Sequence, residues 1–344
     1  MAYYFNLPLI TELTPDQQRA VDETNPLGLS GGPGTGKSVV SLWRHIRNHS
    51  TGLKNSLLLT YTKTLEHYLK ASANTQNVNA GNNIDRIFWW ITHNATEYDE
   101  IIIDEAQDID KVRFESFFNY SSNISYGADQ RQSIYLDSNG LNELLDWFND
   151  DSRFKNNAKI SLNRNFRNSK EILLFTRSVF PDFMIPQNTI NGSNVSGLKP
   201  ILKLNLGWEI DRQVDAIVDI IKDFQSDTHN IAILVPFQKM VDTYYDAIRI
   251  KLDNNITLTK FKSDDDVFTG LSGVHITPFK SSKGTEFDTV IIPEFDRYDW
   301  IIKKMDNINE NDYYVAFTRT KTNLFLLCRD NYPNIGDINT VTIE

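Results

Sequence analysis

Cysteine, histidine and long apolar runs are scarce in this 344-residue sequence, which has one cysteine, Cys328, and six histidines. A single cysteine excludes an internal disulfide framework and is typical of the reducing cytosol, so we expect a cytoplasmic protein. No apolar run reaches the length of a membrane span. The first ten residues contain no basic segment of the kind that begins a signal peptide. We therefore expect no membrane partner.

Metal-ligating side chains are equally scarce. His45 and His49 lie one helical turn apart, but no third ligand accompanies them. The pair therefore fits a solvated helix face better than a zinc site. Basic charge is also limited, because 35 Lys and Arg residues face 45 Asp and Glu residues. The resulting net charge of −10 argues against a broad basic surface, although a narrow basic groove remains compatible with it.

Apolar residues make up 40% of the chain, enough for two cores. Short apolar runs alternate with helical patterns, which predicts α/β domains with parallel sheets. The runs fall into two groups, so we predict an N-terminal domain over 1–158 and a C-terminal domain over 159–344. Two segments rich in Asn, Ser and Gly, 71–83 and 187–197, are predicted to be loops.

The segment "GGPGTGKS" has the spacing of a phosphate-binding loop, with Gly31, Gly34 and Gly36 followed by Lys37 and Ser38. Glycines allow backbone N–H groups to surround a phosphate chain, and the following helix adds its N-terminal dipole. The lysine then reaches the β- and γ-phosphates of ATP, and the serine binds Mg²⁺. A glycine-rich turn without a ligand is the alternative that we consider weaker.

The segment "IIIDEAQDID" places four acids directly after an apolar strand. In phosphate-loop enzymes such a strand ends in an acid that holds Mg²⁺, so we predict that Asp104 joins Ser38 as a metal ligand. Glu105 is the candidate base for the attacking water. Helix capping is the alternative for each acid, and we prefer it for Asp110, which precedes a helical pattern.

With these motifs in place, the chain resembles the UvrD/Rep-type superfamily 1 helicases over nearly its whole length. The resemblance implies two RecA-like lobes with parallel sheets and a nucleotide cleft between them. It also implies ATP hydrolysis coupled to movement along single-stranded DNA from 3′ to 5′. "LTPDQQRAV" is similar to the family's glutamine motif, in which Gln17 would read the adenine edge. "GADQRQSIY" resembles the third motif, in which Gln132 would sense the γ-phosphate and Asp129 is the acid three residues earlier.

The same resemblance extends through the second half of the chain. "LNRNFRNSKEI" makes Arg167 a γ-phosphate contact, and "YYVAFTRTKT" makes Arg319 the arginine finger. "FKSSKGTEF" places Gly284 and Glu286 near the ribose and the γ-phosphate. For either arginine alone, a surface salt bridge would be the default interpretation.

Nucleic-acid contacts are implied by "RIFWWITHN", by "LLLTYTKTLEHYL" and by Lys280 of "FKSSKGTEF". "RIFWWITHN" holds Trp89 between two other aromatic residues, and base stacking and a buried aromatic cluster are equally good interpretations of it. The residues implied by the family motifs are Thr60, Tyr61, Thr62, Lys63 and Lys280.

Departures from the family pattern concern how nucleic acid is handled. The connections that carry a large insert in each lobe of family members are short here, and Lys280 stands where the family has histidine. We therefore expect weak strand binding and poor duplex unwinding by the chain alone. The resemblance also allows a nucleic-acid-sensing ATPase subunit that regulates a protein partner such as a nuclease in phage defence. An ATPase without nucleic acid would suit the acidic charge but leaves "TYTK" unexplained.

Overall fold

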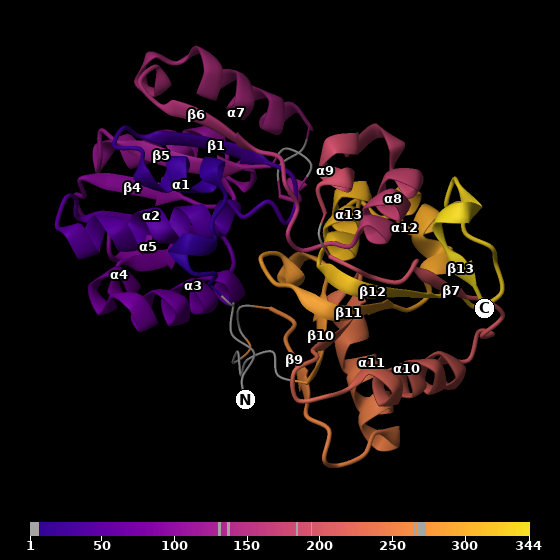
Figure 1. Ribbon diagram of the computed structural model, residues 1–344. Helices are drawn as coiled ribbons and strands as arrows, with labels where there is room; N and C mark the ends of the chain where they lie inside the picture. The colour runs from indigo at the N-terminus through magenta and orange to yellow at the C-terminus, as the bar shows by residue number, and fades with distance from the viewer. Residues whose placement is uncertain are drawn as a thin grey trace. The chain divides into compact units, whose positions relative to one another are not determined.

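The computed structural model describes residues 7–129, 132–135, 138–183, 185–193, 195–263, 266 and 273–344. The chain divides into two compact units, with the division between Arg164 and Asn165 (Figure 1). The boundary predicted after residue 158 lies at the first residue of a strand that pairs within the N-terminal unit.

The N-terminal unit is built on a six-stranded sheet in the order β3-β2-β4-β5-β1-β6, in which every pair is parallel. Its central strands are buried along their length, as expected for a parallel sheet covered on both faces. In chain order the strands are β1 (Leu27–Gly31), β2 (Ser56–Thr60), β3 (Ile84–Arg86), β4 (Glu100–Ile103), β5 (Ile124–Ala128) and β6 (Ala158–Leu162).

Helices connect these strands. Thr14 starts the first long one with a capping box shared with Gln17, and Pro15 occupies its first turn. The helices are α1 (Pro15–Asp22), α2 (Lys37–Thr51), α3 (Lys63–Gln76), α4 (Val78–Asn82), α5 (Ile87–His93), α6 (Lys111–Ser116) and α7 (Ser138–Asp150). Short 3₁₀ turns are η1 (Ile10–Glu12), η2 (Ala106–Asp108), η3 (Phe117–Asn119) and η5 (Ser152–Phe154).

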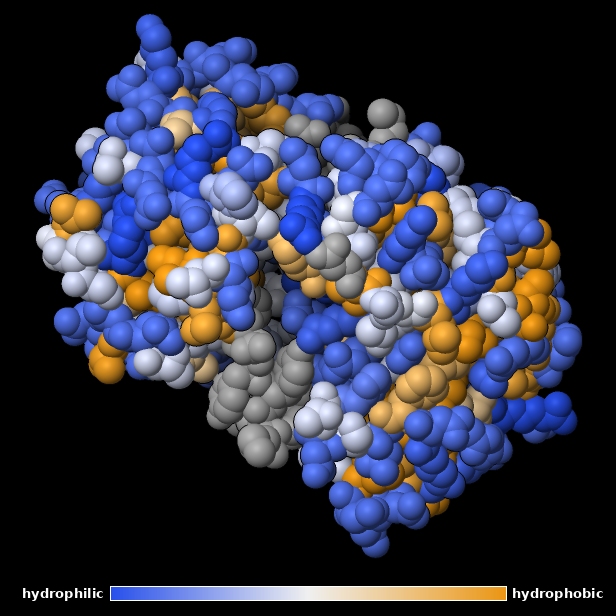
Figure 2. All heavy atoms as spheres, viewed as in Figure 1, coloured by the Kyte–Doolittle hydropathy of each residue, from blue (hydrophilic) through white to orange (hydrophobic). Residues whose placement is uncertain are grey.

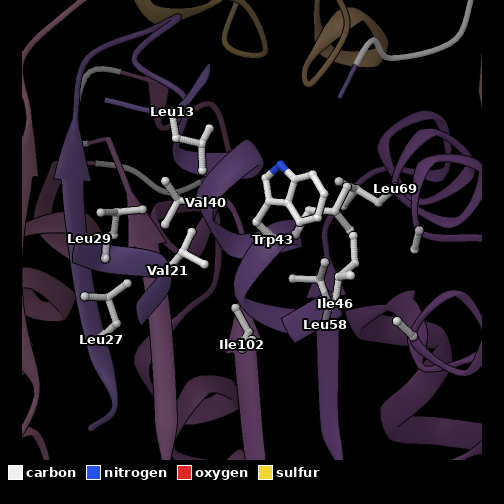
Figure 3. Packing of buried hydrophobic residues seen from close by; sticks show 14 of the residues in the cluster. Leu13, Val21, Leu27, Leu29, Val40, Trp43, Ile46, Leu58, Leu69 and Ile102 are labelled. Atoms are coloured by element: carbon white, nitrogen blue, oxygen red, sulfur yellow. The ribbon is translucent and has the colours of Figure 1, made fainter. Parts of the chain in front are cut away.

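Helix α2 anchors the phosphate loop to the core. Its apolar side chains pack against buried residues of the sheet, so its N-terminus is held at a fixed place at the sheet edge. Figure 3 shows this packing for Val40, Trp43 and Ile46 of α2 with Leu27, Leu29, Leu58 and Ile102 of the strands.

The C-terminal unit has a seven-stranded sheet in the order β13-β7-β12-β11-β8-β10-β9, again with parallel pairs throughout. The predicted α/β class with parallel sheets is therefore confirmed for both units. The strands are β7 (Ile201–Lys203), β8 (Ile231–Val235), β9 (Leu258–Lys260), β10 (Val274–Pro278), β11 (Phe287–Ile292), β12 (Thr320–Leu327) and β13 (Thr342–Ile343).

The helices of this unit also cover a buried sheet core. They are α8 (Lys170–Val179), α9 (Gln187–Asn191), α10 (Ile210–Phe224), α11 (Gln238–Lys251), α12 (Tyr298–Lys304) and α13 (Glu310–Thr318). The 3₁₀ turns are η6 (Pro181–Phe183), η7 (Lys280–Ser282), η8 (Phe295–Arg297) and η9 (Ile338–Thr340). In the part of the chain that the structure describes, no helix combines the length and apolar character needed to cross a membrane.

Two loop predictions need correction. Residues 71–83 are mostly helical, because α3 continues to Gln76 and Asn77 caps α4. Burial of Ala73 and Ala80 in the core favours helix there despite the loop-like composition. The first residues of 187–197 form α9, in which Thr189 and Ile190 are buried.

The predicted solvated face at His45 is also wrong. Its ring is fully buried and bonds the Ser56 hydroxyl and the Ala80 carbonyl, each at 2.9 Å. Burial lowers the pKa of His45 to about 3, so this histidine is a neutral part of the core.

Hydrophilic residues cover most of the face in Figure 2, and hydrophobic residues form small groups among them.

Candidate nucleotide site and nucleic-acid face

Three neighbouring strands of the N-terminal sheet carry the predicted site residues at their ends. The strands β4, β5 and β1 are adjacent and parallel, so their carboxyl ends lie at one edge of the sheet. Gly31 ends β1, Asp104 follows β4 and Asp129 follows β5. The topology therefore brings the phosphate loop, the acid pair and the third motif together.

The glycines of the phosphate loop meet two physical requirements. Gly34 and Gly36 have φ values of 67° and 88°, in the left-handed region that favours glycine. At Gly31 a Cβ would lie 2.6 Å from the Leu162 carbonyl oxygen, so a larger residue would displace β6 or the loop.

Lys37 points into this loop. Its buried ammonium donates to the Gly31 and Gly32 carbonyl oxygens at 2.8 and 3.0 Å and lies 3.8 Å from an Asp129 carboxylate oxygen. The cation is thus held at the point where the loop backbone turns. Its predicted contact with the β- and γ-phosphates of ATP stays a prediction.

Gln17 supports the loop from α1. Its side-chain oxygen accepts from the Thr14 amide at 2.9 Å, and its nitrogen donates to the Thr35 carbonyl at 3.1 Å. Both ends of the amide are therefore used within the protein. Its role in reading adenine stays a prediction, and it requires exchange of the bond to Thr35.

Asp104 is the least compensated charged group at this edge. It is 1% exposed, and neither carboxylate oxygen accepts a complete hydrogen bond from any residue that the structure describes. Burial and the adjacent Glu105 raise its pKa to about 7, although the Ser38 hydroxyl and Lys37 act in the opposite direction. A divalent cation would satisfy such a carboxylate.

The pair of Asp104 and Ser38 suits Mg²⁺. This ion is bound through one or two carboxylates, with waters and substrate phosphates completing its shell. Among the residues described, no cluster of three or more His, Cys, Asp or Glu side chains is arranged to hold a metal. The chain thus fits a phosphate-dependent Mg²⁺ site rather than a self-sufficient metal cage.

Glu105 has an unusual backbone conformation. Its φ and ψ are 59° and 41°, which is left-handed and uncommon for a residue with a side chain. The Gln107 side-chain amide donates to its carboxylate at 2.5 Å. Strain of this kind clusters at functional sites, and the role of Glu105 as the base stays a prediction.

The other two acids after β4 have structural partners. Asp108 accepts from the Ile134 amide at 3.2 Å. Asp110 caps α6, accepting from the Arg113 amide at 2.9 Å and from its guanidinium at 2.7 Å. The helix-capping prediction for Asp110 is confirmed.

Gln132 and Asp129 lie in one hydrogen-bond network with the acid pair. The Gln132 amide donates to Asp129 at 2.7 Å, and the Asp129 backbone amide donates to Gln107 at 3.0 Å. Gln107 was given no role by the motif pattern. The sequence shows Gln107 within "DEAQD". The fold is needed to show that its side chain connects Glu105 to the residue that follows β5.

In the C-terminal unit, Arg167 and Glu286 form an ion pair. The Arg167 guanidinium lies 2.9 Å from one Glu286 oxygen, and Lys321 lies 3.1 Å from the other. Burial alone would raise the pKa of Glu286, but the two cations lower it to about 2. These predicted residues, far apart in sequence, therefore come together.

Arg319 is buried at the C-terminus of α13. It donates to the Val315 and Thr285 carbonyls at 3.2 and 3.3 Å. Gly284, beside Thr285, has a φ of 83° and shapes the turn that receives the guanidinium. Arg319 thus lies beside the fifth motif, and its role at a γ-phosphate stays a prediction.

Aromatic side chains gather near the carboxyl end of β2. Tyr61 stacks on Tyr135 with ring centroids 4.2 Å apart and meets Phe88 edge-on at 5.3 Å. Arg113 lies 4.4 Å above the Phe88 ring. Phe88, Trp89 and Tyr135 are each at least 38% exposed. We call Tyr61, Phe88 and Tyr135 the aromatic face.

The two interpretations of "RIFWWITHN" each hold for part of the segment. Trp90 is 1% exposed and belongs to the core, while Phe88 and Trp89 are 40% and 48% exposed. Trp89 stacks on His93 at 3.9 Å. Helical geometry explains the division, since adjacent residues on α5 point to different sides.

The remaining nucleic-acid candidates have local roles as well. Thr60 is buried, Thr62 caps α3 by accepting from the Leu65 amide at 3.3 Å, and Lys63 begins that helix. Lys280 lies 3.9 Å from the buried Asp312 carboxylate in the C-terminal unit. Their contacts with a strand remain predictions.

Comparisons with known proteins agree with this architecture. The chain matches no family model and no curated protein sequence. Its fold is similar to that of Dbp5 from S. cerevisiae, solved with RNA and ADP BeF3, with 11% identity, a TM-score of 0.57, and coverage of 92% of this chain and 84% of Dbp5. At this identity the likeness concerns the fold alone, which is that of two RecA-like α/β lobes.

Two other solved structures, matched with a lower TM-score, carry the word helicase in their names. One is the C-terminal domain of a possible DNA helicase from Lactobacillus plantarum WCFS1, with 18% identity, a TM-score of 0.39, and coverage of 52% of this chain and 98% of that domain. The other is the PRRSV helicase, with 13% identity, a TM-score of 0.45, and coverage of 91% and 54%.

Proposed function

We propose that this protein is an ATP-dependent translocase or helicase of UvrD-like type. It moves along single-stranded nucleic acid, DNA rather than RNA, from 3′ to 5′. The observation that carries the proposal is the buried Asp104 carboxylate, which lacks a complete hydrogen bond from the described residues, beside the left-handed Glu105. Both lie at the sheet edge that also holds the phosphate loop.

The N-terminal lobe supplies the chemistry of hydrolysis. The loop glycines and Lys37 bind the phosphates of ATP, and Ser38 and Asp104 would hold Mg²⁺, which neutralises charge on the β- and γ-phosphates. Glu105 orients a water molecule and takes its proton as the water oxygen attacks phosphorus. ADP leaves with the electron pair of the broken bond.

The C-terminal lobe supplies the arginines that the resemblance assigns to the γ-phosphate. Arg167 is held by Glu286 and Arg319 by backbone carbonyls, so both side chains are ordered before they act. Preorganised cations lower the barrier because they need no rearrangement as charge develops on the phosphoryl group.

The aromatic face supports the nucleic-acid part of the proposal. Exposed rings offer stacking surfaces to bases of any sequence, and a stacked base contributes about 1–3 kcal/mol. Arg113 adds a cation beside this face. With a net charge of −10, affinity should rest more on stacking than on phosphate contacts.

ATP turnover measured alone and with single-stranded DNA, single-stranded RNA or duplex tests this function. Strong stimulation by single-stranded DNA is expected, and a flat response to every nucleic acid would refute the proposal. An unwinding assay on a 3′-tailed duplex then separates the translocase from the helicase, and we expect poor unwinding by the chain alone.

A second candidate is an ATPase subunit that senses nucleic acid and regulates a partner such as a nuclease in phage defence. The short connections within the lobes favour this candidate, because they leave no room for a large insert. Residues 77–99 alone connect α3 to β4, and residues 252–273 alone connect α11 to β10. Stimulated turnover without movement along a strand in a displacement assay would favour this candidate.

A further inference from the structure

Gln107 is placed to control Glu105. It is fully buried on η2, the 3₁₀ turn that follows Glu105 directly. Its side-chain nitrogen donates to the Glu105 carboxylate at 2.5 Å, and its side-chain oxygen accepts from the Asp129 backbone amide at 3.0 Å. The side-chain amide of Gln107 thus connects Glu105 to Asp129, which follows β5.

Further bonds tie the same two segments together. The Ser133 hydroxyl donates to the Gln107 backbone carbonyl at 3.2 Å, and the Ile134 amide donates to Asp108 at 3.2 Å. The next residue, Tyr135, stacks on Tyr61 in the aromatic face. The described residues from Asp129 to Tyr135 therefore contact both the turn that carries Glu105 and the face assigned to nucleic acid.

The chemistry of the amide suits a positioning role. Glutamine has both a donor and an acceptor, and here each end has a defined partner, so flipping the amide would break both bonds. A left-handed backbone at Glu105 needs surrounding structure to maintain it. A shift in the segment after β5 would move the Gln107 amide and, with it, the Glu105 carboxylate.

We propose that Gln107 is a positioning residue that orients Glu105 for attack on ATP and makes this orientation depend on the segment bearing Tyr135. The inference rests on the proposed function, because it needs Glu105 to act on ATP. It goes further in assigning the position of the base to one side chain and in linking that position to the aromatic face.

Gln107→Met tests the proposal, because it keeps the length of the side chain and removes both the donor and the acceptor. ATP affinity should change little, while kcat should fall by about tenfold to a hundredfold, as for a misplaced catalytic group. Stimulation by single-stranded DNA should also weaken. Gln76→Met, at the exposed end of α3, is the matched control and should behave as wild type.

A double-mutant cycle distinguishes positioning from a general structural role. In the Glu105→Gln background, Gln107→Met should have almost no further effect on kcat, because the group that it orients has already lost its function. Equal losses in both backgrounds, or a parallel loss of ATP affinity, would show that Gln107 does not act through Glu105.

The wild-type measurements keep the two proposals distinct. If wild type hydrolyses ATP and Gln107→Met retains its kcat, the positioning role is refuted and the proposed function stands. If wild type turns over without stimulation, nucleic-acid dependence fails along with the link to the aromatic face, while basal kcat still decides the positioning of Glu105. A wild type with no ATP turnover would overturn both.

Discussion

The two lobes contain the same backbone device with different charges around it. In each, a buried strand is followed by one residue, a glutamate in the left-handed conformation and a 3₁₀ turn. In the N-terminal lobe the sequence is Asp104–Glu105 after β4, and in the C-terminal lobe it is Pro293–Glu294 after β11. Proline cannot ligate a metal, so of these two turns the one after β4 carries an acid pair and the one after β11 does not.

The partners of the two glutamates differ just as clearly. Glu294 accepts from the Tyr244 hydroxyl at 3.1 Å and from Arg297 at 3.2 Å, and Arg329 lies 3.7 Å away. The pair at 104 and 105 includes a carboxylate without such compensation. The same turn therefore carries an ion-pair cluster in the C-terminal lobe and the proposed catalytic acids in the N-terminal lobe.

The largest expected effect follows removal of the cation in the phosphate loop. Lys37→Ala should abolish ATP turnover, because the β- and γ-phosphates lose the ammonium that binds them. In the C-terminal lobe, the strand β8 is followed by Pro236 and Phe237 instead of glycines. A coupled phosphate-release assay measures the loss of turnover. Lys155→Ala, at an exposed site of the N-terminal lobe, is the control and should retain activity.

Matched substitutions of the two glutamates test the comparison directly. Glu105→Gln should keep ATP affinity and lower kcat by about three orders of magnitude or more, because it removes the base and keeps the shape. Glu294→Gln should hydrolyse ATP at a rate within about twofold of wild type, as expected away from the chemistry. Near-normal hydrolysis by Glu105→Gln would remove this glutamate from the mechanism.

The arginines of the C-terminal lobe should show a similarly large effect on rate. Arg167→Ala and Arg319→Ala should each slow hydrolysis by about three orders of magnitude, as loss of an arginine finger does. ADP affinity should hardly change, because neither arginine is expected to reach the β-phosphate. Arg212→Ala, at an exposed position on α10, is the control. Normal hydrolysis by either variant would exclude that arginine from the γ-phosphate.

Glu105→Gln should have the larger effect on kcat, but Glu294→Gln should have the larger effect on the free energy of unfolding. Glu294→Gln should lower the free energy of unfolding by about 1–3 kcal/mol, because the mostly buried Arg329 loses part of its compensation. Glu105→Gln should cost less, because a charge is removed beside the buried Asp104. Urea unfolding of both variants at neutral pH measures the difference, and equal losses would mean that the two clusters are electrostatically alike.

The last prediction concerns Asp312, a buried acid of the C-terminal lobe. Burial raises its pKa from 3.8 to about 6, although Lys280, the Asn309 amide and Lys283 lower it. A raised carboxylate pKa favours folding at low pH, so its contribution to stability falls as pH rises from about 4 to 6. At about 1.4 kcal/mol for each unit of pKa, the full change is about 3 kcal/mol.

Replacing this acid removes the pH dependence that it causes. Asp312→Asn should match wild type near pH 4 and be more stable at pH 7, as measured by urea unfolding. Asp306→Asn, at an exposed position nearby, should leave the slope unchanged. A variant less stable than wild type at pH 7 would show that the ion pair with Lys280 outweighs burial.

Local patterns in the sequence predicted what depends on adjacent residues. The phosphate loop, the acid pair after β4 and the cap at Asp110 each lie within about ten residues, where spacing and backbone preference decide the structure. Apolar runs also predicted parallel α/β sheets, because strands covered on both faces need apolar side chains throughout. The loop predicted from composition at 71–83 is wrong. The segment is mostly helical, because burial of Ala73 and Ala80 outweighs the preference of Asn and Ser for loops.

Only the tertiary structure decided which distant side chains meet. Gln107 contacts Asp129, Tyr61 stacks on Tyr135, and Arg167 pairs with Glu286, although more than a hundred residues separate the last two. The same holds for the two glutamates: their short motifs look alike, but Glu294 is surrounded by Tyr244 and Arg329 from other elements. The physical reason is that hydrogen bonds and ion pairs act over a few ångströms, and packing of the sheets determines which groups come that close.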